Sequence, residues 1–314
     1  MTTVCNEFDS ILEKYNKAKL NTYKVLELIG SDYTFTKYGA DVVDKRYNEI
    51  LNCGTVLTFT EEIKDKKSIY HLTGANFCRQ RICPMCQFRK SEKTFAEMLK
   101  VVEYLEERNY RFLHLVLTIP NCKNGEELVN GIKLLYKSFC KFIRNKQVKR
   151  AFKGILRCLE ISYNYDTDEF HPHLHCLVVV NSSYFNDTKV YLSYDKITEI
   201  WTDSVGLGLP YPLQCSIRAM KKGDRSGVAE VCKYCVKPLD LGERSLERDI
   251  QNINVLLTLG HTLKGTRFLQ KYGVVKEAYN ILFKGDSSEY FEEVNANEHK
   301  TTYFWNSQTL RFCR

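Results

Sequence analysis

The segment Phe170-His171-Pro172-His173-Leu174-His175, which runs directly into Cys176-Leu177-Val178-Val179-Val180, carries the strongest structural signal in the chain. Its apolar second half is rich in β-branched residues and is typical of a buried strand. Because successive side chains of a strand project to opposite faces, we expect His171, His173 and His175 on one face. The whole chain has seven histidines, so three on one strand face predict a site for a single divalent metal ion. The alternative is a polar strand end whose histidines face water.

The strand before this segment is expected to pair with it. Gly154–Tyr165 has the composition of a strand, and only Asp166-Thr167-Asp168-Glu169 separates it from Phe170. A connection this short implies an antiparallel hairpin. Another apolar strand, residues 111–119, stops at Pro120 and is followed by a helical pattern over 126–149. The expected fold class is therefore α+β, with a central antiparallel sheet and flanking helices.

The remaining segments divide the chain into three expected parts. Residues 1–95 hold an amphipathic helix over 7–28, a hairpin of strands 55–59 and 68–72, and the start of a helix over 89–108. Residues 96–242 hold the histidine strand, a strand over 213–220 and a helix over 228–236 that Pro238 stops. Residues 243–314 mix helix-like and strand-like stretches, and the sequence assigns them no role.

Composition narrows the class of protein. Hydrophobic residues make up 44% of the 314 residues and charged residues 27%, as in ordinary globular proteins. No window approaches the roughly 18 apolar residues that span a bilayer, and the N-terminus lacks a signal-peptide pattern. We therefore expect a cytoplasmic protein that makes no membrane contact. The net charge of +8, from 46 Lys and Arg against 38 Asp and Glu, favours a polyanionic partner.

A carboxylate completes the candidate metal site. Glu160 lies on the strand before the histidines, and the hairpin would bring the two strands side by side. A carboxylate and two imidazoles suit Mg²⁺ or Mn²⁺ and leave coordination positions open for substrate oxygens. His173 and His175 are the first-choice ligands. Glu160 and His171 compete for the third place, because the strand register decides which of them reaches the ion; Glu160 could equally be a solvated strand residue.

A nucleophile is available in the segment Glu230-Val231-Cys232-Lys233-Tyr234-Cys235-Val236-Lys237. Residues four apart share a helix face, so Glu230 and Tyr234 would be neighbours, with Lys237 one turn beyond Tyr234. A nearby metal or lysine favours the phenolate of a tyrosine, and its attack on a phosphodiester would give a phosphotyrosyl intermediate. The chain has 20 tyrosines, so Tyr234 stands out only in combination with the histidine strand.

Three cysteines form a second metal-binding pattern in Cys78-Arg79-Gln80-Arg81-Ile82-Cys83-Pro84-Met85-Cys86. In a reducing compartment, a Cys-x-x-Cys knuckle is typical of a zinc site rather than of disulfides. Cys53 is the first choice as fourth ligand, with His71 in reserve. A site with four protein ligands is structural. The alternative is a set of unrelated buried thiols.

Basic residues lie on both sides of this knuckle. The four that we predict to contact DNA phosphates are Arg79, Arg81, Arg89 and Lys90. They could equally form an ordinary solvated basic surface.

Together these segments resemble the single-tyrosine replication initiators of rolling-circle plasmids, a family with a His-hydrophobe-His (HUH) endonuclease core. The family's first motif, an apolar strand that ends in Leu-Thr, is similar to Leu115-Val116-Leu117-Thr118. Its second motif is similar to His171-Pro172-His173-Leu174-His175, and its third to the segment from Glu230 to Lys237. The cysteine-rich segment resembles the N-terminal part of one large branch. The resemblance covers about residues 50 to 240, with the motifs in the family's order.

The resemblance implies an enzyme that nicks one DNA strand at the double-strand origin of its own replicon, where a hairpin exposes the nick site. Tyr234 would attack the scissile phosphate, hold the 5′ end covalently and release a 3′-OH primer. The ion at His173 and His175 would orient the phosphate, Glu230 could activate water for the terminating cleavage, and Lys237 would help to neutralise charge. Host helicase and DNA polymerase are implied as partners.

Two other functions fit part of the pattern. A single-tyrosine HUH transposase with an N-terminal zinc module shares the same core, and a non-catalytic DNA-binding protein would explain the zinc knuckle and the basic excess. The sequence does not determine which origin sequence is recognised or the oligomeric state. In a homodimer, a second subunit could supply the step that ends a round of replication.

Overall fold

The computed structural model describes residues 7–29, 40–208, 210, 212–232, 245–284, 290–291 and 299–314. The chain forms two compact units. Unit 1 comprises the described parts of 1–93, 239–260 and 285–314, and unit 2 those of 94–238 and 261–284. The residues from 243 onward, which the sequence suggested as one region, are therefore divided between the two units rather than forming a third.

Unit 2 is built on a five-stranded sheet in which every pair of neighbours is antiparallel, and this confirms the α+β interpretation. Strand β5 (Glu169–Asn181), which carries the histidines, is the middle strand. Along the sheet the order is β6 (Cys215–Ala219), β3 (Tyr110–Thr118), β5, β4 (Phe152–Asn164) and β7 (Leu269–Gly273). The edge strand β7 was not foreseen, because its five residues carry no clear alternation.

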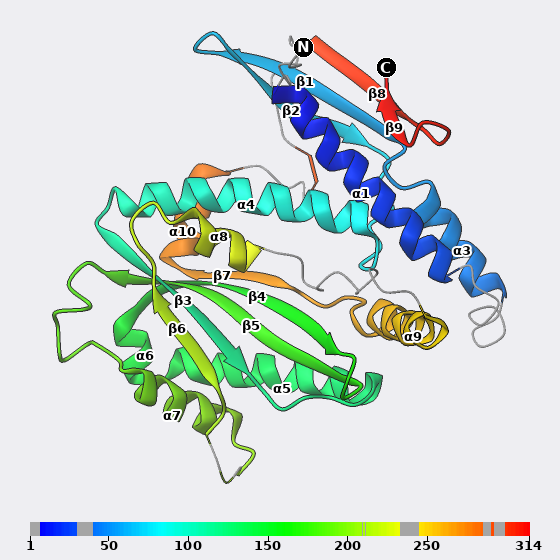
Figure 1. Ribbon diagram of the computed structural model, residues 1–314. Helices are drawn as coiled ribbons and strands as arrows, with labels where there is room; N and C mark the ends of the chain where they lie inside the picture. Colours follow the sequence, from blue (N-terminus) through cyan, green and yellow to red (C-terminus); the bar gives the residue numbers. More distant parts are fainter. Residues whose placement is uncertain are drawn as a thin grey trace. The chain divides into compact units, whose positions relative to one another are not determined.

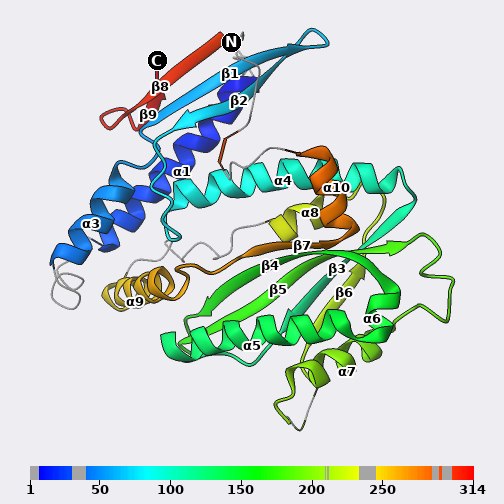
Figure 2. The ribbon, with the colours of Figure 1, turned by 180° about the vertical axis from the view of Figure 1, so that it is seen from behind.

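Helices cover both faces of this sheet, as Figures 1 and 2 show from opposite sides. One face carries α5 (Gly125–Arg144), α6 (Lys146–Ala151) and α7 (Tyr194–Val205). The other carries α8 (Arg225–Cys232), α10 (Val274–Leu282) and the second half of α4 (Pro84–Glu106). Because both faces are covered, β5 is buried almost continuously, and it reads as an apolar run after the histidines.

The core beneath α4, α8 and α10 follows the alternation of the strands. Leu177 and Val179 on β5 and Leu156 and Cys158 on β4 point to that side, where they pack with Met98 and other residues of the helices.

The single helix expected over 126–149 is interrupted at Asn145. The backbone N–H of Asn145 donates to carbonyl oxygens in the last turn of α5. The side chain of Asn145 accepts hydrogen bonds from Gln147 N and Val148 N at the start of α6.

A four-residue turn, residues 165–168, joins β4 to β5 and sets their register. The side chain of Asn164 accepts hydrogen bonds from the backbone N–H groups of Asp166, at 2.9 Å, and Thr167, at 3.3 Å. Asp168 completes the turn in the left-handed region, with φ 55°. Four pairs along the hairpin from Asn164 and Glu169, Glu160 lies opposite His173.

Unit 1 contains a four-stranded sheet of order β2-β1-β8-β9. The expected hairpin is present as β1 (Val56–Lys64) and β2 (Lys67–Ala75), and the C-terminal strands β8 (His299–Asn306) and β9 (Arg311–Cys313) continue the sheet. The helices of this part are α1 (Glu7–Ile29), α3 (Ala40–Leu51), α9 (Leu246–Thr262), most of which belongs to unit 1, and the first part of α4. Phe8 of α1 packs on Phe59 and Tyr303, with ring centroids 5.2 and 5.3 Å apart.

None of the helices within the described residues combines the length and the apolar character needed to cross a membrane.

Candidate metal centres

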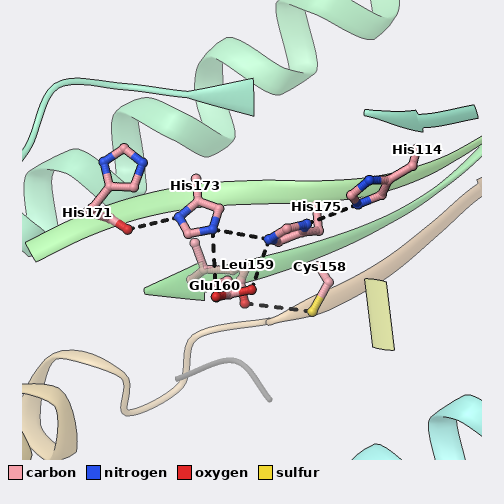
Figure 3. Close-up of polar contacts among 7 residues, drawn as sticks. All are labelled: His114, Cys158, Leu159, Glu160, His171, His173 and His175. Carbon is pink, nitrogen blue, oxygen red and sulfur yellow. Dashed lines mark hydrogen bonds and ion pairs between the residues drawn. The ribbon is translucent and has the colours of Figure 1, made fainter. Parts of the chain in front are cut away.

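The hairpin of β4 and β5 brings a carboxylate to the histidines. Glu160 is the paired residue of His173, and its Oε1 lies 3.8 Å from His173 Nε2. Its Oε2 lies 2.9 Å from His175 Nε2, and the two Nε2 atoms are 3.2 Å apart. Figure 3 shows the three side chains pointing toward one another from adjacent strands. All three side chains are buried, and their donor atoms lie within 4.8 Å of one another.

In both histidines the other ring nitrogen, Nδ1, lies within hydrogen-bonding distance of a partner, and this contact orients Nε2. His173 Nδ1 lies 3.0 Å from the carbonyl oxygen of His171, to which it can donate. His175 Nδ1 lies 3.1 Å from Nε2 of His114 on β3. Metal-binding histidines usually donate their other N–H in this way, so that the coordinating nitrogen presents its lone pair. Burial lowers the pKa of His173 to about 4, which keeps its imidazole neutral near pH 7.

His171 packs its ring against that of His173, with centroids 5.0 Å apart, but is not one of the three converging donors. Its Nδ1 is 2.7 Å from the side-chain oxygen of Asn121, and its ring points away from Glu160 (Figure 3). The histidine alternation therefore places three rings on one strand face, as expected, but only two of them meet the carboxylate. The donor set of one carboxylate and two neutral imidazoles fits a divalent ion such as Mn²⁺ or Mg²⁺.

Helix α8 lies on the same face of the sheet as Glu160 and packs on β4 and β5. Asp224 caps its first turn by accepting hydrogen bonds from Ser226 N and Gly227 N. Glu230 lies in this helix and is partly exposed. Tyr234 and Lys237 lie outside the described residues, as does the end of the helix expected over 228–236. The described part of α8 ends at Cys232, which is buried in the core together with Cys158.

The cysteines of unit 1 form a second cluster. Cys53, Cys78, Cys83 and Cys86 bring their sulfur atoms within 4.8 Å of one another. Two of the separations are 3.4 Å, from Cys53 to Cys86, and 3.7 Å, from Cys78 to Cys86. A tetrahedral ion with Zn–S bonds of about 2.3 Å separates its sulfur ligands by roughly 3.8 Å, so the arrangement fits zinc. His71 is not part of the cluster; its Nε2 lies 2.9 Å from a carboxylate oxygen of Glu62.

Backbone N–H groups stabilise negative charge in this cluster. Cys78 N donates to the sulfur of Cys53 at 3.3 Å, and Arg79 N donates to the sulfur of Cys86 at 3.2 Å. Arg79 can do so because it adopts φ 60°, which turns its N–H back toward the cysteines. Hydrogen bonds from Cys78, Cys83 and Cys86 lower the pKa of Cys53, whereas burial raises the pKa of Cys83.

A buried ammonium group lies beside the thiols. Lys19 of α1 has no exposed surface, and its Nζ donates to the carbonyl oxygens of Leu51 and Cys53, each at 2.7 Å. Burial lowers the pKa of Lys19, while the charge of the neighbouring cysteines raises it. A sequence signal for this residue exists: Lys19 lies four residues after Tyr15 and three before Thr22, both of which are buried on the same helix face.

The four basic residues predicted to contact DNA differ in exposure. Arg79 is exposed, and Arg81 and Lys90 are partly exposed. Arg89 is buried, and its guanidinium donates to the carbonyl oxygen of Tyr290 at 2.6 Å and to the hydroxyl of Tyr15 at 3.4 Å. In this conformation Arg89 holds parts of unit 1 together and does not present its charge to a phosphate.

Comparison with known proteins identifies the family. The sequence model of the family described as "Replication protein" matches residues 69–312. The chain belongs to this family. It is 34% identical to Protein rep of Staphylococcus aureus over 191 residues, which cover 60% of this chain and 81% of that protein. It is 31% identical to Protein rep of Lactiplantibacillus plantarum over 252 residues, 77% of each chain.

A third replication protein, Protein rep of Streptococcus pneumoniae, is 33% identical over 231 residues, which cover 72% of this chain and 68% of that protein. No solved structure matches the chain. The resemblance to rolling-circle plasmid replication initiators, first noted from short motifs, is confirmed by this family membership.

Proposed function

We propose that this replication protein nicks one DNA strand at its plasmid origin through a covalent 5′-phosphotyrosine on Tyr234. The observation that carries the proposal is the convergence of Glu160, His173 and His175 on the sheet face that also carries α8. In a family of replication initiators, a divalent-metal site on the sheet face that carries the helix preceding the candidate nucleophile in sequence is suited to phosphodiester cleavage. The match to replication proteins favours this function over transposition and over DNA binding without catalysis.

Glu160, His173 and His175 would hold the ion. When bound, Mn²⁺ or Mg²⁺ supplies polarisation of the scissile phosphate and charge stabilisation for the leaving oxygen. The buried position of the three ligands keeps them fixed, and a single carboxylate among the donors would leave the ion with net positive charge to attract a phosphate.

Tyr234 follows α8 by two residues. Cys232, the last described residue of α8, packs in the same core cluster as Cys158, and Cys158 is the paired residue of His175. Two further residues span at most roughly 7 Å of chain. The short distance in sequence between Tyr234 and Cys232 supports Tyr234 as the nucleophile.

In the proposed reaction the Tyr234 oxygen attacks the phosphorus and forms a P–O bond as the bond from phosphorus to the 3′ oxygen breaks. The phenolic proton leaves the tyrosine, and the released 3′ oxygen is protonated to become the primer. Lys237 would neutralise the phosphate charge. In the terminating cleavage, Glu230 would accept a proton from water as that water attacks the displaced strand's phosphodiester and the bond from phosphorus to the 3′ oxygen breaks. The 3′-OH released in this way would attack the phosphotyrosine, which rejoins the displaced strand and frees the Tyr234 hydroxyl.

The cysteine cluster would hold a structural Zn²⁺ in unit 1. Around it, Arg79, Arg81 and Lys90 are the side chains with exposed surface that could contact DNA phosphates. We propose origin DNA, single-stranded or as a hairpin at the nick site, as the substrate. Host helicase and DNA polymerase would act on the product in the cytoplasm, and a homodimer would let a second subunit close the cycle.

The test mixes the purified protein and Mn²⁺ with the supercoiled replicon that encodes it, followed by a denaturing gel for protein-linked DNA. We expect an adduct with the wild type and with Tyr191→Phe, a control at an exposed tyrosine of unit 2. Tyr234→Phe should give no adduct yet bind the origin normally. Adduct formation by Tyr234→Phe would refute the assignment of the nucleophile, and origin binding without an adduct in either metal would refute nicking.

A further inference from the structure

His114 occupies an unusual position on β3. It interrupts the apolar run from Phe112 to Leu117, and only 6% of its surface is exposed. Its Nε2 lies 3.1 Å from Nδ1 of His175, and the two rings are nearly parallel at 15° with centroids 5.3 Å apart. The contact crosses from β3 to β5, where it approaches the metal site from the side opposite Glu160 (Figure 3).

The direction of this hydrogen bond follows from the chemistry of His175. His175 Nε2 faces Glu160 and His173, so a metal at this site takes the lone pair of Nε2. A neutral imidazole that coordinates through Nε2 carries its proton on Nδ1. Nδ1–H of His175 therefore donates, and Nε2 of His114 accepts, which requires His114 to be neutral with its own proton on Nδ1.

A packing role alone does not account for a histidine here. The neighbouring face of β3 and β5 is filled by Phe112 and Leu177, and an apolar side chain would satisfy the same surface. A buried imidazole costs free energy unless it is hydrogen-bonded. Nε2 of His114 lies where it can accept the hydrogen bond that fixes the tautomer of His175.

We propose that His114 is a positioning residue of the metal site, which holds the ring of His175 in the orientation and tautomer that bind the ion. This inference rests on the proposed metal site and extends it from β4 and β5 to a third strand of the sheet, β3. Outer partners of metal-binding histidines typically change metal affinity by roughly 10- to 100-fold when removed. The same size of effect is expected here.

The test uses three variants and measures Mn²⁺ affinity by calorimetry and by electron paramagnetic resonance, without DNA. His114→Phe keeps a planar ring but removes the acceptor. His114→Gln places an amide oxygen close to the position of Nε2 and can accept the same hydrogen bond. Phe112→Leu, two residues away on the same strand face, makes a cavity in the core cluster and leaves the side chains of both histidines in place.

We expect His114→Phe to bind Mn²⁺ roughly 10- to 100-fold more weakly, and His114→Gln and Phe112→Leu to bind close to wild type. The ring ¹⁵N shifts of His175 should report an Nδ1–H tautomer in the wild type and a mixture in His114→Phe. Equal affinity of wild type and His114→Phe would overturn the inference, as would an equal loss in Phe112→Leu. If the wild type itself binds no Mn²⁺ or Mg²⁺, the proposed metal site has failed, which is a separate outcome.

Discussion

Glu160 on β4 and His173 on β5 are a directly paired couple of neighbouring antiparallel strands, and their side chains approach to 3.8 Å. The candidate metal site is therefore a product of one hairpin. Its two histidines come from one strand and its carboxylate from the other.

Glu160→Gln should weaken Mn²⁺ binding by at least about tenfold, because it removes the charged donor while keeping the shape of the side chain. His171→Gln is the matched control, since His171 bonds to Asn121 outside the site. Calorimetric titration of both variants checks this. A loss of affinity in His171→Gln with none in Glu160→Gln would assign the third ligand to His171 instead.

The metal-free protein should lose stability as the pH falls. The pKa of His173 is lowered by burial to about 4, below its ordinary value of 6.5, so the unfolded chain binds a proton before the folded chain does. The contribution to the free energy of unfolding is fully present above pH 6.5 and is lost as the pH falls toward 4, by up to about 3 kcal/mol.

Urea unfolding of unit 2 across this pH range measures the effect. His173→Phe should flatten the dependence between about pH 6.5 and about pH 4, since it removes the group that titrates. The same slope in wild type and variant would assign the loss of stability to other groups.

Cys83→Ser should release the metal of the cysteine cluster and destabilise unit 1. Cys83 is fully buried in the cluster, and a structural zinc ion contributes its binding free energy to folding. Elemental analysis should find about one zinc ion per wild-type chain and none in the variant. Cys140→Ser, at an exposed cysteine of unit 2, should keep both the zinc and the stability. Equal zinc content in the two variants would contradict the site.

Lys19→Met should lower both zinc affinity and stability. The variant leaves the carbonyl oxygens of Leu51 and Cys53 without their donor, at about 1–3 kcal/mol for a buried unsatisfied group. It also removes the positive charge that offsets the thiolates. Lys14→Met on the same helix is the control, because Lys14 is exposed and forms only a surface ion pair with Glu92. Chelator competition and thermal unfolding of both variants separate the two effects; a Lys19→Met protein that matches Lys14→Met would contradict the role.

Local patterns predicted the parts of the fold that depend on neighbours in sequence. The alternation around His173 predicted β5, and the short loop after Tyr165 predicted its hairpin with β4. The choice between Glu160 and His171 needed the register, which depends on a turn of four residues rather than on composition. The helix break at Asn145 was missed because the apolar pattern continues through it.

The sequence patterns did not predict which strands pair when they are far apart in the chain. Strand β8 pairs with β1 across nearly the whole chain, for example Tyr303 with Leu57, and no local periodicity encodes such a partner. His114 was also missed, although a lone histidine within an apolar strand is a recognisable signal. Its meaning became clear only when the sheet placed it next to His175.

The length of the turn at residues 165–168 determines whether Glu160 faces the two histidines. Adding or removing one residue there would shift β4 against β5 by one position and turn the side chain of Glu160 to the opposite face of the sheet. The other side chains of β4 would turn with it, and the carboxylate would face the helices on the far side of the sheet. Length variation, which loops usually tolerate, is therefore expected to be far more damaging in this turn than a substitution within it.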